Sequence, residues 1–261
     1  MPCDPPPTAV AHLQVHGRLC RFLAPRRRAG SFAIRFQGSP AVKDPVEAAG
    51  IPHTEVGRVT VDGLQANLAA RLRGGERVEV HPVETREAGL PPRFVLDVHL
   101  GRLAADLRLL GIDAAYGNSL DDDALQAIAV SEGRVLLTRD TGLLKRTDVP
   151  AGAFVYATAP AEQLAETVAR FGLAPHARPW SRCTRCNAGL VLVAADAVAG
   201  RIPPRVRATT RDFLECTGCR RVYWRGTHEA GLRKRLGAAE ARVAPRACAP
   251  TSPPDLARTD R

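Results

Sequence analysis

The chain has 261 residues, enough for two or three modest domains, and no run of 18 apolar residues or secretory signal pattern, so we expect a cytoplasmic protein without a membrane partner. The formal net charge of +10 lies in the last third: residues 177–261 carry 17 basic and 7 acidic side chains, whereas residues 91–176 carry 8 and 11. This asymmetry fits a protein that grips a nucleic-acid backbone with one part and performs chemistry with another, and a solvated arginine-rich surface explains it equally well.

Residues 10–84 predict an α+β domain. "HLQVHG" and "SFAIRFQG" alternate apolar and polar residues as half-buried strands do, and a short helix follows at "VKDPVEAAGI". "VGRVTVDG" and "ERVEVHPV" are two further strands. The order of these elements resembles the β-grasp, or ubiquitin-like, fold. "EAGLPP", Glu87 to Pro92, is the expected linker to the next domain.

Residues 93–176 predict an α/β domain. Strands are expected at "RFVLDV", "IDAAYG", "RVLLTRD" and "AFVYAT", and helices at "LGRLAADLRLLG", "SLDDDALQAIAVSEG" and "PAEQLAETVARFG". Apolar strands that alternate with helices imply a parallel sheet covered on both faces.

Two of these strands end in a carboxylate, Asp97 in "RFVLD" and Asp140 in "RVLLTRD". A right-handed crossover can place both at the ligand-binding edge of the sheet, where converging carboxylates call for a cation such as Mg²⁺ or Mn²⁺. Asp121, Asp122 or Asp123 could supply a third ligand. Each residue also has a simpler reading, because Asp140 could cap the next helix and the triple aspartate could complement a helix dipole.

Two Cys-x-x-Cys pairs, "CTRC" and "CTGC", occur within residues 179–236. Four thiolates in this pattern close a tetrahedral Zn²⁺ site, and full coordination by Cys183, Cys186, Cys216 and Cys219 makes the zinc structural. A redox-active Cys-x-x-Cys needs no second pair. The remaining residues, 237–261, are rich in Ala, Pro and Arg and are expected to be disordered.

"FVLDVHLGRLAADLRLLGIDAAY" and "DDDALQAIAVSEGRVLLTRDTGLLKR" resemble the Mut-seven C-terminal RNase domain family, which is related to the PIN nucleases. The resemblance implies metal-dependent RNA cleavage and a PIN-like fold. It assigns the metal-binding set to Asp97, Asp122 and Asp140, and it places Arg102 and Arg108 near RNA. Asp121 and Arg139, the latter from the "LTRD" signature, are possible additional residues of the catalytic site. Where the family tends to have Arg-Trp, this chain has Ala105-Asp106, so Asp106 is either a fourth carboxylate or a residue on the solvent face.

The cysteine region also resembles the zinc ribbon that follows the nuclease domain in this family, and the N-terminal segment resembles its ubiquitin-like domain. RNA contacts in the ribbon are expected from the residues Arg220, Arg221, Tyr223, Trp224 and Arg225. The two aromatic side chains could stack on bases, or they could fill the core of a small metal domain. His228 could be a spare ligand, a phosphate contact or a turn residue.

The sequence therefore predicts a metal-dependent ribonuclease with RNA as its partner. The ubiquitin-like domain would serve docking to a protein partner or regulation. The competing hypothesis is an RNA- or ribosome-binding adaptor that keeps the fold and uses its aspartates structurally.

Overall fold

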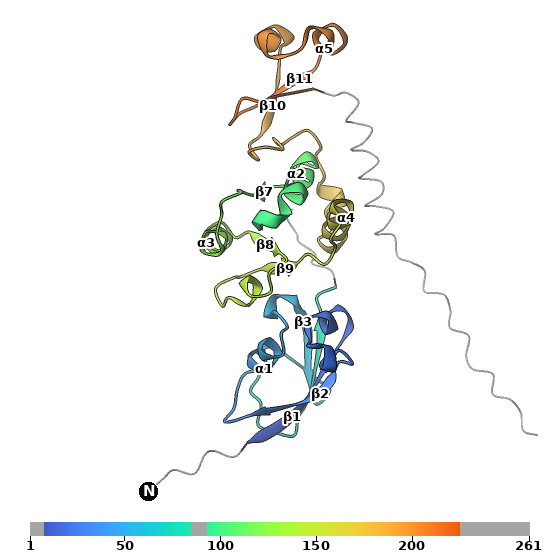
Figure 1. The fold of residues 1–261 in the computed structure, drawn as a ribbon, viewed down its shortest axis with the longest axis vertical. Coiled ribbons are helices and arrows are strands. Elements are labelled where there is room, and N and C mark those ends of the chain that lie inside the picture. The colour runs from blue at the N-terminus through green and yellow to red at the C-terminus, as the bar shows by residue number, and fades with distance from the viewer. Residues whose placement is uncertain (1–7, 85–92, 225–261) are drawn as a thin grey trace, which may run out of the picture.

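Three sheets follow one another along the long axis of the molecule in a computed structural model that describes residues 8–84 and 93–224 (Figure 1). The N-terminal domain lies at one end, the parallel sheet in the middle and the cysteine-bearing ribbon at the other end. The predicted linker at Glu87–Pro92, the tail at 237–261, Arg225 and His228 lie outside the described residues.

The N-terminal domain is a five-stranded mixed sheet with the order β2-β1-β5-β3-β4. Its central pair, β1 and β5, is parallel, and the other pairs are antiparallel. Its elements are β1 Ala9–Val15, β2 Ser31–Phe36, α1 Lys43–Ala48, β3 Val56–Val61, β4 Leu64–Ala66 and β5 Arg77–Pro82, with 3-10 helices at Gly17–Phe22, Pro25–Arg27 and His53–Glu55. The apolar residues of the predicted alternating pattern are buried: Leu13, Val78 and Val80 of the two central strands all lie in the core.

The middle domain is a four-stranded sheet that is wholly parallel, as the sequence predicts. Its strand order is β7-β6-β8-β9. Its elements are β6 Phe94–Leu96, α2 Gly101–Leu109, β7 Ala114–Ala115, α3 Asp122–Glu132, β8 Val135–Thr138, β9 Gly152–Phe154 and α4 Pro160–Arg170, with 3-10 helices at Val98–Leu100, Leu143–Lys145 and Ala174–His176.

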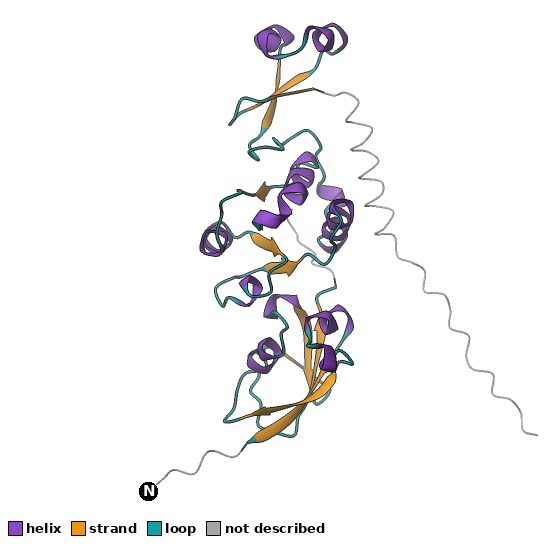
Figure 2. Cartoon of the chain, viewed as in Figure 1, coloured by secondary structure: helices purple, strands orange, loops and turns teal. Residues whose placement is uncertain are grey.

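Successive residues of each central strand enter opposite cores of this domain. Phe94, Leu96 and Leu137 pack with α2 and α4, whereas Val95 and Leu136 pack with α3. Helices thus flank the sheet on both sides (Figure 2). Both faces being buried explains why the strand sequences are continuously apolar.

The C-terminal ribbon is an antiparallel three-stranded sheet, β10-β11-β12. Its elements are β10 Leu190–Val193, α5 Pro204–Thr209, β11 Phe213–Cys216 and β12 Val222–Trp224, with a 3-10 helix at Ala195–Arg201. The helices enclose a small core around Val198, Ile202 and Phe213.

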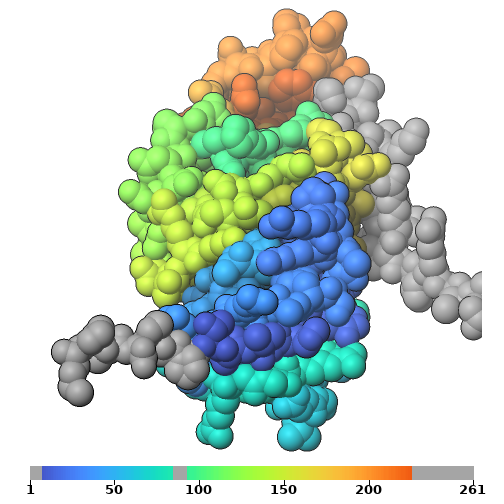
Figure 3. Space-filling model, turned by 60° about the horizontal axis from the view of Figure 1, so that its bottom comes forward, coloured from blue at the N-terminus to red at the C-terminus, as the bar shows by residue number. Residues whose placement is uncertain are grey.

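The chain enters the ribbon past the end of α2, where Arg178 N donates to Leu110 O at 2.7 Å. Gly111 ends α2 with φ +81°, as its position after the predicted helix suggests, and a Cβ atom there would lie 2.1 Å from Arg178 O. Only glycine therefore permits this close approach. At the opposite end, the surface of the N-terminal domain lies directly against the parallel-sheet domain (Figure 3).

Candidate carboxylate and metal sites

A pocket of about 420 Å³ opens where β6 and β8 end. The two strands are neighbours, with Leu96 paired to Leu137, so Asp97 and Asp140 reach the same edge of the sheet. The pocket is lined by Asp97, Val98, His99, Leu120, Asp122, Arg139, Asp140 and Thr141. The structure thus gathers the three principal predicted carboxylates around one cavity.

Thr138 links the two strand-end aspartates. Its hydroxyl donates to Asp97 Oδ2 at 2.6 Å and accepts from Asp140 N at 2.9 Å. Asp97 is only 7% exposed and also receives the backbone N–H of His99 at 3.4 Å. Asp140 is exposed, and its Oδ1 accepts from Gly142 N at 2.6 Å. Asp140 therefore closes a local turn with one oxygen while it lines the pocket.

The three carboxylates share a pocket without a tight cluster. Within the described ranges, the groups of three or more ligand atoms that lie within 4.8 Å of one another do not include Asp97, Asp122 and Asp140. Asp122 is the first residue of α3, and its Oδ2 lies 3.7 Å from Arg146 Nη2. An ion that interacted with all three residues would therefore need bridging waters, which Mg²⁺ commonly retains.

The additional acidic candidates have other contacts. Asp121 is the N-cap of α3, where its Oδ1 accepts from Ala124 N at 2.8 Å, so it follows the simpler reading. Asp106 is 5% exposed and pairs with Arg102 at 3.2 Å, and it is not among the residues that line the pocket. This burial contradicts the alternative that Asp106 lies on the solvent face.

Two of the predicted functional arginines point at backbone carbonyls. Arg108 is 3% exposed and donates to Ala114 O, Thr184 O and Arg185 O, so it joins the parallel sheet to the cysteine segment and its side chain is not available to RNA. Arg139 Nη1 donates to the carbonyls of residues 155, 156 and 157 at 2.6–3.2 Å, which indicates a structural role beside the pocket. Arg102 remains exposed.

The four cysteines form a group of candidate ligands whose sulfur atoms all lie within 4.8 Å of one another. Sγ of Cys183 lies 3.6 Å from that of Cys219, and Sγ of Cys186 lies 3.3 Å from that of Cys216. These separations exclude disulfides, whose S–S length is about 2.05 Å. They approach the distance of about 3.8 Å that separates thiolates on a tetrahedral zinc ion with Zn–S bonds of about 2.3 Å.

The thiols of this group differ in acidity. Burial raises the pKa of Cys186, but hydrogen bonds from the backbone of Ala188 and from neighbouring thiols outweigh it and lower the pKa to about 6. Burial raises the pKa of Cys216 to about 12. The group thus supplies one thiolate readily and releases further protons when a cation binds.

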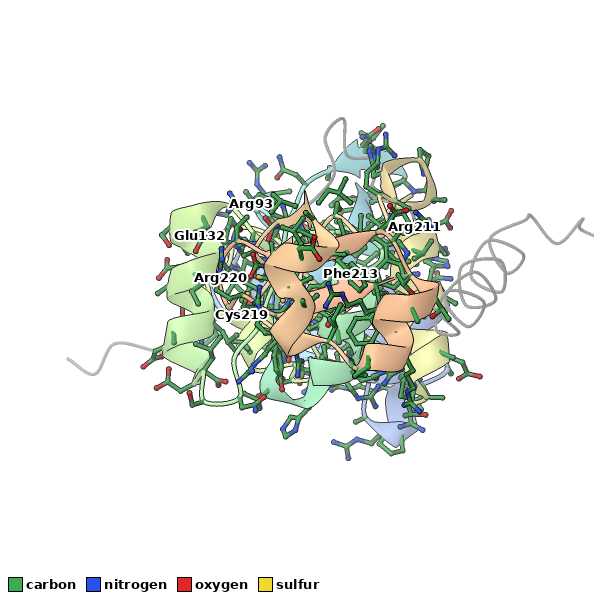
Figure 4. The ribbon with its side chains drawn as sticks, turned by 90° about the horizontal axis from the view of Figure 1, so that it is seen from above. Arg93, Glu132, Arg211, Phe213, Cys219 and Arg220 are labelled. Carbon is green, nitrogen blue, oxygen red and sulfur yellow. The ribbon has the colours of Figure 1, made fainter. Side chains whose placement is uncertain are left out.

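The aromatic residues Tyr223 and Trp224 of the ribbon are half-buried and contact groups of its interior. The hydroxyl of Tyr223 lies 3.0 Å from Cys183 Sγ and 3.2 Å from Thr184 Oγ1, and Trp224 packs on the small core. These contacts favour the core-filling reading over base stacking. Arg220 and Arg221 are exposed, and Arg220 pairs with Glu215; Figure 4 looks from the ribbon end and shows Arg220 beside Cys219.

A second group, which the sequence did not suggest, lies on the outer face of the N-terminal sheet. Glu79 Oε2 is 3.6 Å from His16 Nε2 and 3.8 Å from His81 Nε2. The imidazoles stack in parallel at 4.1 Å, so their lone pairs cannot converge on one ion. Burial first, then His16 and Arg58, lower the pKa of His81, and Arg58 Nη2 lies 3.0 Å from His81 Nε2. We assign no metal to this group.

Sequence reasoning also missed the polar residues that hold the domains together. At the ribbon boundary, the Asp113 carboxylate accepts hydrogen bonds from Arg134 and Asn187 and forms an ion pair with Arg182. At the opposite boundary, Glu55 forms an ion pair with Arg170. Neither position carries a local signal, because its partners are distant in the chain.

A parallel α/β sheet with carboxylates at its C-terminal edge, joined to a β-grasp domain and a four-thiol ribbon, defines a mixed α/β protein with two candidate metal sites. Among the helices in the described parts of the chain, none has both the length and the apolar character to cross a bilayer. Residues 92–236 match the family described as the Mut7-C RNAse domain, and residues 8–88 match that described as Mut7-C ubiquitin. The first match covers more than half of the chain, which therefore belongs to the Mut7-C RNAse domain family.

The family resemblance and the ubiquitin-like character of the N-terminal domain are thus confirmed. The chain is also similar to the exonuclease mut-7 homolog of Homo sapiens, with 29% identity over 238 residues. The aligned region covers 86% of this chain and 23% of that protein, so the chain spans about a quarter of the length of this relative.

Proposed function

We propose that the protein is a metal-dependent ribonuclease that hydrolyses RNA phosphodiester bonds at the Asp97–Asp122–Asp140 pocket. The observation that supports this most directly is the common cavity of these carboxylates at the C-terminal edge of a parallel sheet, in a chain of an RNase family. We further propose a PIN-like domain at 93–176, a zinc ribbon at 179–236 and a ubiquitin-like domain at 10–84. The expected cytoplasmic location stays a prediction.

The donor set of the pocket fits a hard cation. Carboxylate oxygens are the ligands that Mg²⁺ and Mn²⁺ prefer, and the cavity has room for retained waters. Asp97, Asp122 and Asp140 would hold the ion, which supplies a water of lowered pKa and charge stabilisation for the leaving oxygen. In the ribbon, the four thiols would hold structural Zn²⁺.

The chain's own residues prepare this pocket. The Thr138 hydroxyl fixes Asp97 Oδ2 in a nearly buried position, and the turn to Gly142 fixes Asp140. Because the Thr138 hydroxyl bonds the Asp97 carboxylate and the backbone N–H of Asp140, it keeps the ends of the two strands together at the pocket. His99, which also lines the pocket and is exposed, offers an imidazole to the phosphate backbone.

Cleavage of a labelled RNA by the purified full chain, with Mg²⁺ or Mn²⁺ against EDTA, tests the proposal. Asp140→Asn should reduce the rate at least about 100-fold, because it removes a ligand charge from the site. The amide oxygen of asparagine can still accept from Gly142 N, so the turn and the fold should persist. Asp123→Asn is the matched control, since Asp123 lies in the same acidic run, pairs with Arg146 and does not line the pocket.

The alternative is the RNA- or ribosome-binding adaptor, which the local turn made by Asp140 favours. In that case both variants would bind RNA like the wild type and none of the three proteins would cleave it. Equal cleavage by the wild type and Asp140→Asn would also contradict the proposed site.

A further inference from the structure

A fully buried carboxylate links the ubiquitin-like domain to the domain with the catalytic pocket. Glu55 is 0% exposed and ends the 3-10 helix that precedes β3. Its Oε1 accepts from Phe154 N at 2.7 Å and from Arg170 Nη2 at 2.8 Å, and its Oε2 accepts from the hydroxyl of Tyr156 at 2.7 Å. Three groups of the neighbouring domain therefore share one carboxylate.

Two of the partners of Glu55 lie at the end of β9: Phe154 is its last residue and Tyr156 follows two residues later, whereas Arg170 ends α4. Phe22 of the ubiquitin-like domain packs on both Phe154 and Tyr156, with ring centroids 5.2 and 5.8 Å away. Burial raises the pKa of Tyr156 far above its ordinary value, and the nearby Glu55 carboxylate adds to the effect. The phenol thus remains a donor, and the N-terminal domain contacts the segment Phe154–Ala157 at Phe154 and Tyr156. Within the parallel-sheet domain, Glu166 of α4 accepts from Tyr156 N at 3.0 Å and from Ala157 N at 2.8 Å.

The same segment holds the motif that lines the pocket. The carbonyls of Val155, Tyr156 and Ala157 accept from Arg139 Nη1, and Val155 N donates to Thr138 O at 2.9 Å. Thr138 contacts Asp97, and Arg139 precedes Asp140. A continuous chain of bonds thus runs from Glu55, through residues 154–157, to the carboxylates.

We propose that Glu55 is a positioning residue for the carboxylate site. Through Glu55, the ubiquitin-like domain holds Arg139 and Asp140 in place and is required for full nuclease activity. This inference rests on the proposed ribonuclease function. A loosely tethered docking module would not need a desolvated carboxylate with a paired arginine at its boundary, since removal of either partner would leave an uncompensated charge. The burial of Arg170, 4% exposed in its side chain, marks the contact as a fixed one.

The test compares the full-length wild type with Glu55→Gln. Glutamine keeps the size of the side chain but loses the charge opposite Arg170 and presents an NH₂ group to donors. Loss of an outer-shell contact typically costs about 10–100-fold in metal affinity or activity, so kcat and the Mn²⁺ affinity measured by EPR should both fall in that range, with the KM for RNA less affected. Asp113→Asn, which breaks a carboxylate–arginine contact on the ribbon side where the Asp113 side chain is 18% exposed, is the control and should change both quantities by less than about twofold.

A double variant separates positioning from general loss of stability. If Glu55 acts through Arg139, Glu55→Gln should add less than about twofold to the effect of Arg139→Gln on kcat, because contacts in one chain are not additive. Should Glu55→Gln fail to fold, Tyr156→Phe removes one hydrogen bond to Glu55 and keeps the ring, and it should lower Mn²⁺ affinity about two- to tenfold.

The outcomes distinguish this inference from the proposed function. A wild type that neither cleaves RNA nor binds Mn²⁺ overturns the ribonuclease. An active wild type whose Glu55→Gln or Tyr156→Phe variant keeps the kcat and Mn²⁺ affinity of the Asp113→Asn control overturns the role of Glu55. If the effects of Glu55→Gln and Arg139→Gln on kcat are fully additive, Glu55 does not act through Arg139.

Discussion

Replacement of Asp113 by asparagine should destabilise the protein at the boundary between the parallel sheet and the ribbon. Asp113 Oδ1 accepts from Arg134 Nη1 at 2.5 Å and from Asn187 Nδ2 at 2.8 Å, and its Oδ2 lies 3.1 Å from Arg182 Nη2. The Asp113 side chain is 18% exposed and that of Arg134 is 6% exposed, so the substitution leaves a nearly buried guanidinium without its counter-charge.

The size of the effect follows from burial. Breaking a buried pair costs about 3–5 kcal/mol; the retained amide oxygen and the partial exposure of Asp113 reduce our expectation to about 2 kcal/mol at pH 7. Burial raises the pKa of Asp113, but hydrogen bonds from Arg134 and Asn187 outweigh it and hold the pKa below its ordinary value. The advantage of the wild type should therefore be complete above the unfolded pKa of about 3.9 and disappear as the pH falls through the folded pKa.

Urea denaturation of both proteins, followed by circular dichroism at a series of pH values between 7 and 3, measures this difference. Release at acid pH of the zinc proposed for the ribbon would affect both proteins, so the comparison uses the difference between them. Asp196→Asn is the control, because Asp196 pairs with Arg207 at the surface with 89% of its side chain exposed, and it should change stability by less than about 0.5 kcal/mol. A loss at Asp113 as small as in the control, or one that grows as the pH falls, would refute the reasoning.

Two further predictions concern the ribbon. Cys186→Ser should lower the zinc content from about one ion per chain, measured by elemental mass spectrometry, and increase hydrogen exchange in β10–β12; unchanged metal content would contradict the four-thiol site. Arg108→Lys should lower the free energy of unfolding by about 1–3 kcal/mol without weakening RNA binding, because lysine cannot reach three carbonyls at once, whereas Arg102→Lys at an exposed position should be nearly neutral in stability. If Arg108→Lys instead weakened RNA binding and left the stability unchanged, Arg108 would contact RNA, as the sequence first led us to expect.

Local pattern was sufficient for much of the fold. Continuous apolar runs such as that before Asp140 predicted parallel strands, and the strand-end rule predicted that Asp97 and Asp140 would meet at one edge. The spacing of the cysteine pairs predicted the four-thiol group, because two residues between ligands suit one ion. These inferences succeed because strand periodicity and ligand spacing are properties of short segments.

The roles of individual polar side chains depended on the tertiary structure. Asp113 resembles an ordinary loop residue in the sequence, and Glu55 has no distinguishing neighbours, yet each becomes a buried partner of a distant arginine. Arg108 and Arg139 belong to the family motifs, but their guanidinium groups donate hydrogen bonds to backbone carbonyls. Asp140 showed itself to be both a turn-forming residue and part of the pocket.

The amino-acid sequence by itself determined the elements, the parallel sheet and the cysteine group, whereas the tertiary structure decided which charges are buried and what they hold. The physical reason is that the energy of a buried charge depends on the groups that surround it after the domains have docked. Glu55 and Arg170 are separated by 115 residues, and only the packed interface brings the carboxylate to the guanidinium.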